Sequence, residues 1–240
     1  MSQLPTPRES PRIPPCVAAV ALLVVALVAP AARGQQPQKA PADAEPEVLN
    51  WDVTISGTAA FGVSSSDLEG AMSGAGYGQA ESSGGLMAAS LSPSVRYRIG
   101  DRFALGLSGA SAKIGETTTS GAAPVTIHRT SADVAALFFW RPAPGVRLAA
   151  GPAWYRLTAS PDGGADLTAS RIGAVFEAGV AFPDTGRWYA DLAFQYRLTG
   201  QADLGSYTPR QTGPRANAPI PLGGIPFSHA AFLGGIGYRF

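Results

Sequence analysis

Cysteine is almost missing from this 240-residue chain, and charge of either sign is scarce. Cys16 is the only cysteine, so once that residue is removed the chain can form no disulfide, no cysteine-bound metal site and no thiol nucleophile. Charged residues make up 15% of the sequence, below the roughly 25% of a typical soluble domain. The 18 basic and 17 acidic residues leave a net charge of +1. This balance argues against nucleic-acid binding, because there is no basic excess to neutralise phosphates.

The amino-terminal segment has the pattern of a targeting sequence. Arg8 and Arg12 precede an unbroken apolar run over 16–28, and Ala29-Pro30-Ala31 follows it. We therefore predict a signal peptide over 1–31. An uncleaved helical anchor is the alternative, but thirteen apolar residues fall short of the about 20 that a spanning helix needs. Residues 32–48 are rich in Pro, Ala, Gln and acidic residues and are predicted to form a flexible periplasmic tether.

From residue 49 onward the pattern is that of β-strands. Apolar and polar residues alternate, most clearly over 187–198 (RWYADLAFQYRL), and no helical period is evident. The alternation predicts eight strands, at about 50–63, 86–99, 102–113, 126–141, 146–157, 170–182, 187–198 and 227–240.

The connections between these strands alternate in length. Those at 100–101, 142–145 and 183–186 are tight, whereas 64–85, 114–125, 158–169 and 199–226 are long and rich in Gly, Ser, Asp and Pro. An even number of strands places all long loops at one end and both termini at the other. We predict an all-β fold over 49–240, a closed eight-stranded antiparallel transmembrane β-barrel with short periplasmic turns and long extracellular loops.

Alternation by itself also fits a soluble barrel with its apolar face inward. Two features favour an apolar exterior. The polar faces of the strands carry mostly small residues, which suit a narrow eight-stranded interior, and the chain has only two lysines, Lys39 and Lys113. Aromatic residues gather near the short-turn end, where a bilayer interface selects them. This predicted aromatic girdle comprises Trp51, Tyr97, Phe103, Trp140, Phe182 and Trp188.

The last predicted strand ends in FLGGIGYRF, with Phe232, Ile236, Tyr238 and Phe240 on one face. In this it resembles the outer-membrane β-barrel proteins, in particular the small eight-stranded group that includes the OmpA transmembrane domain. The resemblance covers 49–240 and implies a place in the outer membrane of a Gram-negative cell, in contact with its lipid and lipopolysaccharide. It also implies that those four residues form the signal read by the barrel-insertion machinery. Pro93 and Pro152 depart from the pattern, and we expect bulges or shifted strand boundaries there.

The alternation directs most strand charges into the predicted lumen. Opposite charges in so narrow a space should pair, and we expect Glu177 and Asp191 to hold arginines from neighbouring strands. Such a network either fixes strand register in a closed interior or lines a charge-selective conduit. The predicted network comprises Asp52, Arg96, Arg98, Arg102, Arg129, Asp133, Arg147, Arg171, Glu177, Asp191, Arg197 and Arg239.

A search for an active site finds little to support one. His128 and Thr130 resemble the His-x-Ser pair of outer-membrane lipid A deacylases, but threonine replaces the nucleophilic serine and no carboxylate is expected on that face of the following strand. His229 and Ser228 are adjacent on one strand and so point to opposite faces. The sequence also lacks a P-loop, a Rossmann glycine pattern and a metal-ligand cluster. We therefore expect no catalytic residues, no cofactor and no metal.

These observations predict a monomeric outer-membrane barrel with a structural or surface-interaction role and a charge-filled lumen. Binding would lie in the long loops, first of all in 199–226 with Tyr207, Arg210 and Arg215. The first alternative is a narrow porin-like channel for small solutes or ions. A lipid A-directed hydrolase is the second.

Overall fold

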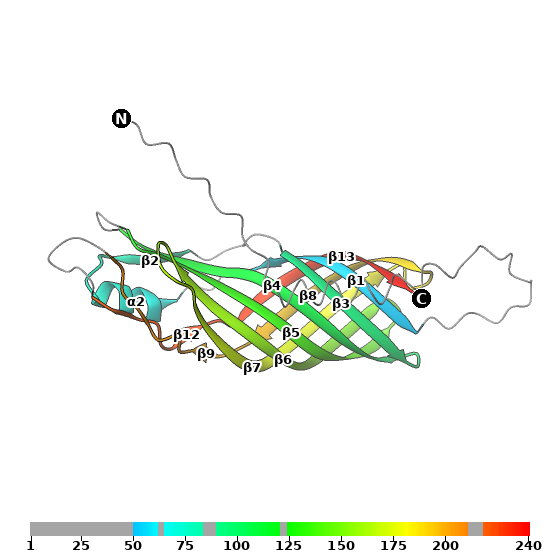
Figure 1. Cartoon of the computed structure of the whole chain (residues 1–240). Helices are drawn as coiled ribbons and strands as arrows, with labels where there is room; N and C mark the ends of the chain where they lie inside the picture. Colours follow the sequence, from blue (N-terminus) through cyan, green and yellow to red (C-terminus); the bar gives the residue numbers. More distant parts are fainter. Residues whose placement is uncertain (1–49, 62–64, 84–89, 121–123, 211–217) are drawn as a thin grey trace, which may run out of the picture.

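The computed structural model describes residues 50–61, 65–83, 90–120, 124–210 and 218–240, and one antiparallel sheet that closes on itself dominates it (Figure 1). The predicted fold is confirmed. The expected signal peptide over 1–31 and tether over 32–48 lie outside the described residues. Eight strands follow one another around the ring, and the last pairs with the first: β1 (Trp51–Ala60), β3 (Ser90–Ile99), β4 (Phe103–Thr119), β5 (Thr126–Ala143), β6 (Val146–Pro161), β7 (Leu167–Phe182), β8 (Trp188–Leu198) and β13 (His229–Arg239).

The barrel wall is taller on one side than on the other. Strands β4–β7 have 16 to 18 residues, whereas β1, β3, β8 and β13 have 10 or 11. The short turns each contain a glycine with positive φ, Gly100 at +78°, Gly145 at +72° and Gly186 at +92°, a conformation that glycine adopts at little cost. Strands β4, β6 and β7 stay within one residue of their predicted bounds at the short-turn end and extend beyond them at the loop end.

No bulge lies at either strand proline, but at each of them the pairing with one neighbouring strand ends or is interrupted. Pro93 pairs with Ile55 in the continuous β1–β3 register, and β3 pairs with β4 only from Ser94 onward, so the missing N–H of Pro93 falls where the ladder with β4 has ended. Pro152 pairs with Ala174 in an unbroken β6–β7 register, whereas the β5–β6 pairing leaves out Gly151 and Pro152. The register shifts lie elsewhere, between Lys113 and Gly115 and between Trp140 and Ala143.

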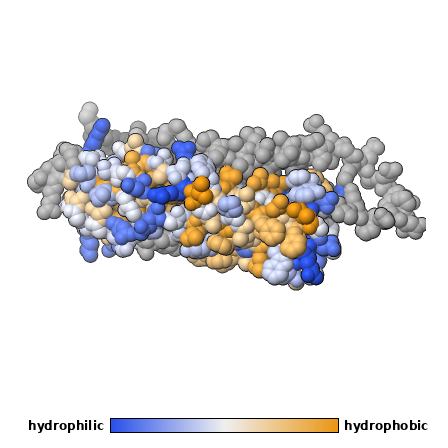
Figure 2. Space-filling view, turned by 90° about the horizontal axis from the view of Figure 1, so that it is seen from below, coloured by the Kyte–Doolittle hydropathy of each residue, from blue (hydrophilic) through white to orange (hydrophobic). Residues whose placement is uncertain are grey.

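The apolar face of the wall points outward. On β8, Trp188 is 65% exposed and Leu192 60%, whereas the alternating Asp191 and Arg197 are 5% and 1% exposed. Figure 2 shows hydrophobic residues gathered over the barrel and hydrophilic residues more frequent over the end that carries the loops. A soluble barrel would place these apolar side chains in its core, so the exterior is built to contact lipid.

The described parts of the long connections fold together at the loop end, which the sequence did not predict. They contain α2 (Ser66–Gly74) and β2 (Ala80–Ser83), which pairs with β4. They also contain the pair β9 (Gln201–Ala202) with β12 (Ile225–Pro226) and the pair β10 (Ser206–Tyr207) with β11 (Ile220–Pro221). We call these elements, with the loop ends of β4–β7, the outer cap. In the part of the chain that the structure describes, no helix is both long and apolar enough to cross a bilayer.

The absence of helix predicted for 49–240 is thus wrong at α2. Ser65 caps this helix by accepting a hydrogen bond from the Leu68 amide at 3.3 Å, and Asp67 and Glu69 lie in its first turn, where carboxylates favour the helix dipole. Nine residues provide too few turns for a visible apolar period, and only Leu68 and Met72 are buried.

The outer cap has an apolar core that joins the interior of the barrel. Its side chains come from α2, from the upper wall and from the loop between β8 and β13, and each is at most 1% exposed: Leu68, Met72, Ile127, Leu157, Ile220, Leu222, Ile225 and Phe227. Burial of each such side chain contributes roughly 1.5–3 kcal/mol relative to leaving it exposed. The cap is therefore a folded part of the molecule that fills the outer end of the barrel.

Candidate functional site: a charged lumen between a filled outer end and an open inner mouth

Three neighbouring strands supply the central ion-pair cluster. Arg147 on β6 donates from Nε to Glu177 Oε1 on β7 at 2.7 Å and from Nη2 to Asp191 Oδ2 on β8 at 2.9 Å. Gln195 Nε2 donates to the other oxygen of Glu177 at 2.6 Å. All four side chains are at most 8% exposed. Each carboxylate thus has a donor, as buried charges require.

Arg96 reaches across the lumen to the opposite wall. Its Nη2 donates to Thr54 Oγ1 at 2.7 Å and to the Tyr189 hydroxyl at 2.6 Å, and the same nitrogen is 4.0 Å from Asp191 Oδ2. The guanidinium carbon lies 5.4 Å from the centre of the Phe139 ring. Arg96 therefore connects β3 to β1 and β8 through the interior.

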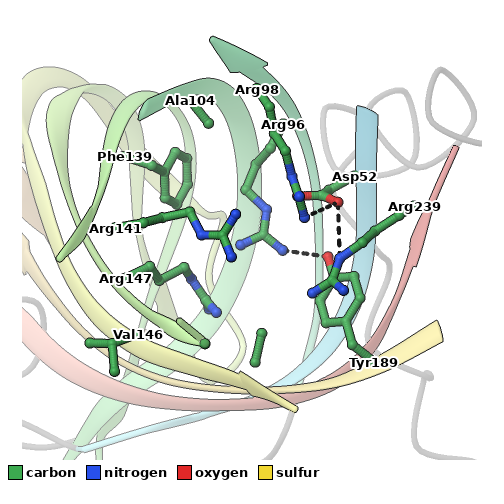
Figure 3. A pocket seen from close by; sticks show the side chains of 12 residues that line it. Asp52, Arg96, Arg98, Ala104, Phe139, Arg141, Val146, Arg147, Tyr189 and Arg239 are labelled. Carbon is green, nitrogen blue, oxygen red and sulfur yellow. Dashed lines mark hydrogen bonds and ion pairs between the residues drawn. The ribbon is translucent and has the colours of Figure 1, made fainter. Parts of the chain in front are cut away.

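Nearer the short turns, Asp52 lies between two arginines (Figure 3). Arg98 donates to both of its carboxylate oxygens at 3.2 Å, and Arg239 Nε lies 3.6 Å from Oδ1. Arg239 Nη1 also donates to the backbone carbonyls of Asp184 and Gly186 at 2.7 and 3.0 Å. This triad connects β1, β3 and β13 to the turn between β7 and β8.

A second buried pair lies toward the loop end. Arg197 Nε on β8 is 3.1 Å from Asp133 Oδ1 on β5, and both side chains are at most 2% exposed. Arg129 Nη1 donates to the Pro226 carbonyl at 3.2 Å and so connects the wall to the outer cap.

Two predicted lumen residues lie elsewhere. Arg102 is exposed because it sits in the turn between β3 and β4, beyond the end of the bore. Arg171 is exposed because β7 pairs with β8 only from Ala174 onward, so no neighbouring strand covers Arg171 on that side. The other ten lie within the wall, buried except for the half-buried Arg98.

Sequence reasoning also missed several participants. Tyr189, Gln195 and Thr54 have the inward parity of Asp191 and Asp52, and a search confined to charged residues passed over them. Arg141 has the same parity as Asp133 and lines the inner cavity, so extending the alternation by one step past Trp140 would have found it.

The predicted girdle residues all lie on the outer surface, between 41% and 78% exposed. Trp51 and Tyr97 are neighbours on β1 and β3, with ring centres 4.9 Å apart, and Trp188 contacts Tyr238 at 4.8 Å. Phe232 and Ile236 also point outward, 51% and 63% exposed. The role of Phe232, Ile236, Tyr238 and Phe240 as an insertion signal stays a prediction.

The open space within the barrel is very uneven. An inner mouth of about 670 Å³ opens between the short turns. The cavity at the level of Arg96 and Arg147 has only about 30 Å³, and the next one outward about 10 Å³. One water molecule needs roughly 10–15 Å³ of cavity volume, so these two spaces admit a few waters at most.

His128, the best catalytic candidate of the sequence, lies at the outer rim between two carboxylates. Its Nδ1 is 3.0 Å from Glu116 Oε2 on β4, and its Nε2 is 3.2 Å from Asp162 Oδ1 after β6. The expectation that no acid lies beside His128 is therefore wrong. Both acids come from segments that extend beyond the predicted strand ends. Lys113 Nζ donates to the same oxygen of Glu116 at 2.6 Å.

Comparison with known proteins finds similar structures and no similar sequences. No family model and no curated protein matches the chain. Among solved structures it is similar to OprG from Pseudomonas aeruginosa, with 13% identity, 80% of this chain and 97% of that one covered, and a TM-score of 0.47. It is also similar to Ail of Yersinia pestis (14%, 80% and 99%, TM-score 0.44) and to Neisserial surface protein A (18%, 79% and 97%, TM-score 0.40).

The class of the protein follows from its own geometry. The sheet closes, so each strand of the ring pairs with a neighbour on both sides and none is a free edge strand. The apolar belt faces outward and carries aromatic residues near the short turns, and the ion pairs face inward. The protein is a small eight-stranded β-barrel of the outer-membrane type, and its place is the cell outer membrane.

Proposed function

We propose that the protein is a closed, non-conducting barrel that presents a folded cap on the cell surface, with a structural or surface-interaction role. The observation that carries this proposal is the outer cap itself. Loops that served only as connections would not need a core of their own, yet Leu68, Leu222 and Phe227 are completely buried. A preformed surface also avoids the entropic cost of ordering loops when a partner binds.

The interior supports a closed barrel over the alternative of a narrow channel. Beyond the inner mouth the space narrows to about 30 Å³ and then about 10 Å³. The side chains that fill it are fixed by ion pairs and hydrogen bonds, so a conducting path would require Arg147 or Arg96 to leave its buried partners. That step is costly, because it leaves charges buried and unpaired.

We also propose that the protein is not an enzyme. Both ring nitrogens of His128 face carboxylates, so neither is directed at a hydroxyl that it could activate. His229 is buried, 2% exposed, and its Nδ1 lies 3.0 Å from the Phe227 carbonyl oxygen. Among the described residues, no hydrogen bond joins a histidine nitrogen to a Ser or Thr hydroxyl.

Contact with lipopolysaccharide is part of the same proposal. Lys113 and the exposed Arg156 have outward parity and lie on the loop side of the apolar belt. Lys113 pairs with Thr130 and Arg156 with Ala132, two residues apart on β5. Cations at that height lie at the level of lipid phosphates, which they can bind.

Two measurements test the proposal. The full chain is reconstituted in planar bilayers, where we expect no steady conductance steps; large, stable steps would favour the channel instead. Cells that display the chain are then compared with cells that display Leu222→Asp, which disrupts the cap core, and Thr208→Asp, which adds the same charge at an exposed cap position. We expect adhesion to surfaces to fall only for Leu222→Asp, and equal adhesion of all three would reject the surface role.

A further inference from the structure

The inner mouth is lined by more positive than negative side chains. Four arginines and two aspartates border it: Arg98, Arg102, Arg141, Arg239, Asp101 and Asp184. They come from the β3–β4 and β7–β8 turns and from the ends of β3, β5 and β13, so each is placed by the closure of the barrel. The mouth faces the periplasm because it lies at the short-turn end.

The side chains of two of these arginines have no partner among the described residues. Arg141 is half-buried, and no side-chain hydrogen bond or ion pair joins it to another described residue; only its backbone amide is bound, to the Arg102 carbonyl at 2.8 Å. The exposed Arg102 side chain likewise has none among the described residues. In Figure 3 the guanidinium of Arg141 points toward Arg96 and Arg147, into the narrow cavity of about 30 Å³ next to the mouth, and Arg141 borders both spaces.

The remaining arginines are only partly neutralised. Asp52 is shared by Arg98 and Arg239, so one carboxylate serves two guanidinium groups. The Nε of Arg239 is buried and has no hydrogen bond among the described residues. The side-chain donors of Arg102 and Arg141 and a surplus of positive charge therefore border one cavity of about 670 Å³, which is large enough for a small ligand.

We propose that the inner mouth is a binding site for an oxyanion with two or more negative charges, held by Arg102 and Arg141. A guanidinium presents N–H donors in a planar fork that matches carboxylate and phosphate oxygens. Such charge-assisted hydrogen bonds are roughly twice as strong as neutral ones. The partial burial of Arg141 strengthens them further, because water and salt screen the charge less there.

The oxyanion can come from two sources. It can be a free phosphate-containing solute of the periplasm. It can also be a carboxylate of the chain itself, since Asp43, Glu45 and Glu47 precede Asn50 by three to seven residues, and Asn50 borders the mouth. At about 3.5 Å per residue, that length of chain reaches the mouth.

The test is calorimetric titration of the full chain, folded in detergent at low salt, with pyrophosphate. We expect saturable binding that Arg141→Gln weakens by at least about tenfold, because the variant keeps a neutral donor and loses the charge. Arg171→Gln, which removes an exposed arginine at the other end of the barrel, should bind as the original does. Heat-modifiable migration confirms that each variant is folded.

A third variant distinguishes the two sources of oxyanion. In Asp43→Asn/Glu45→Gln/Glu47→Gln, tighter pyrophosphate binding shows that the chain's own carboxylates occupy the mouth, and unchanged binding shows that a free solute does. The proposal is overturned if neither the original chain nor this triple variant binds pyrophosphate saturably, or if Arg141→Gln binds it equally well.

Discussion

Arg147 and Asp191 bind each other through two pairs of atoms, although strand β7 lies between their strands. Glu177 on β7 binds the third nitrogen of the same guanidinium at 2.7 Å. One buried cation therefore holds two buried carboxylates from two different strands. The planar fork of arginine makes this possible, and a lysine at the same position would lack the geometry.

Removal of Arg147 should therefore be costly. Arg147→Ala leaves Glu177 and Asp191 buried without their main partner, and we expect a loss of about 3–5 kcal/mol in unfolding free energy. The measurement is urea unfolding in lipid vesicles, followed by heat-modifiable migration. Arg171→Ala is the control, since it removes an exposed arginine, and its unfolding midpoint should not move. Equal midpoints for both variants would show that the cluster adds nothing to stability.

Gly237 makes a close approach that no other residue could make. A Cβ placed there would lie 2.0 Å from the Tyr189 ring, and Tyr189 donates or accepts hydrogen bonds with Arg96 and Thr54. Gly237→Ala should displace this ring and destabilise the barrel by about 1–3 kcal/mol. Gly57→Ala is the matched control on the adjacent strand, since its Cβ would meet only the Gly234 carbonyl oxygen at 3.8 Å. The same urea assay would contradict the account if both variants unfolded alike.

The outer cap should open without loss of the barrel. Leu222→Asp places a charge where the side chain is 0% exposed, so we expect new protease cleavage within 199–210 or 218–226 while heat-modifiable migration persists. Thr208→Asp, at an exposed position, should leave these two segments as resistant as in the original chain. If Leu222→Asp also abolished the barrel, cap and wall would fold as one unit.

The cap should also weaken at high pH. Burial raises the pKa of Tyr77 above its ordinary value of 10.0, with a further contribution from Tyr207, and the neutral hydroxyl donates to the Ala218 carbonyl at 2.5 Å. The neutral form is favoured in the folded state, so its contribution is present below about pH 10 and is lost as pH rises through the folded-state pKa. We expect protease sensitivity of the cap to rise above about pH 10 in the original chain. Tyr77→Phe should be more sensitive at neutral pH and show a smaller further rise.

The barrel could be predicted from the sequence because each strand repeats one simple signal. Alternation assigned all eight strands and both faces, and it directed ten of the twelve named charges into the wall. Arg102 and Arg171 were misplaced because parity gives a direction and does not tell where the neighbouring strand ends. The pairing of β7 with β8 begins at Ala174, and only the three-dimensional register reveals that.

The outer cap could not be predicted in the same way. Its core joins Leu68 to Ile220 and Phe227, which are more than 150 positions apart in the chain and show no shared period. The short pairs β9–β12 and β10–β11 have two residues per strand, too few for alternation to be visible. One local signal was available, the capping serine Ser65 followed by Asp67 and Glu69.

The contact between lipid and wall is the feature on which the rest depends. Nuclear Overhauser transfer from lipid acyl chains to methyl groups, measured on the folded protein in bilayers or nanodiscs, tests it without any substitution. We predict cross-peaks to Leu192, which is 60% exposed on β8, and none to Leu233, which is 8% exposed on the adjacent β13. Acyl-chain cross-peaks at Leu233, or water in place of lipid at Leu192, would contradict the account.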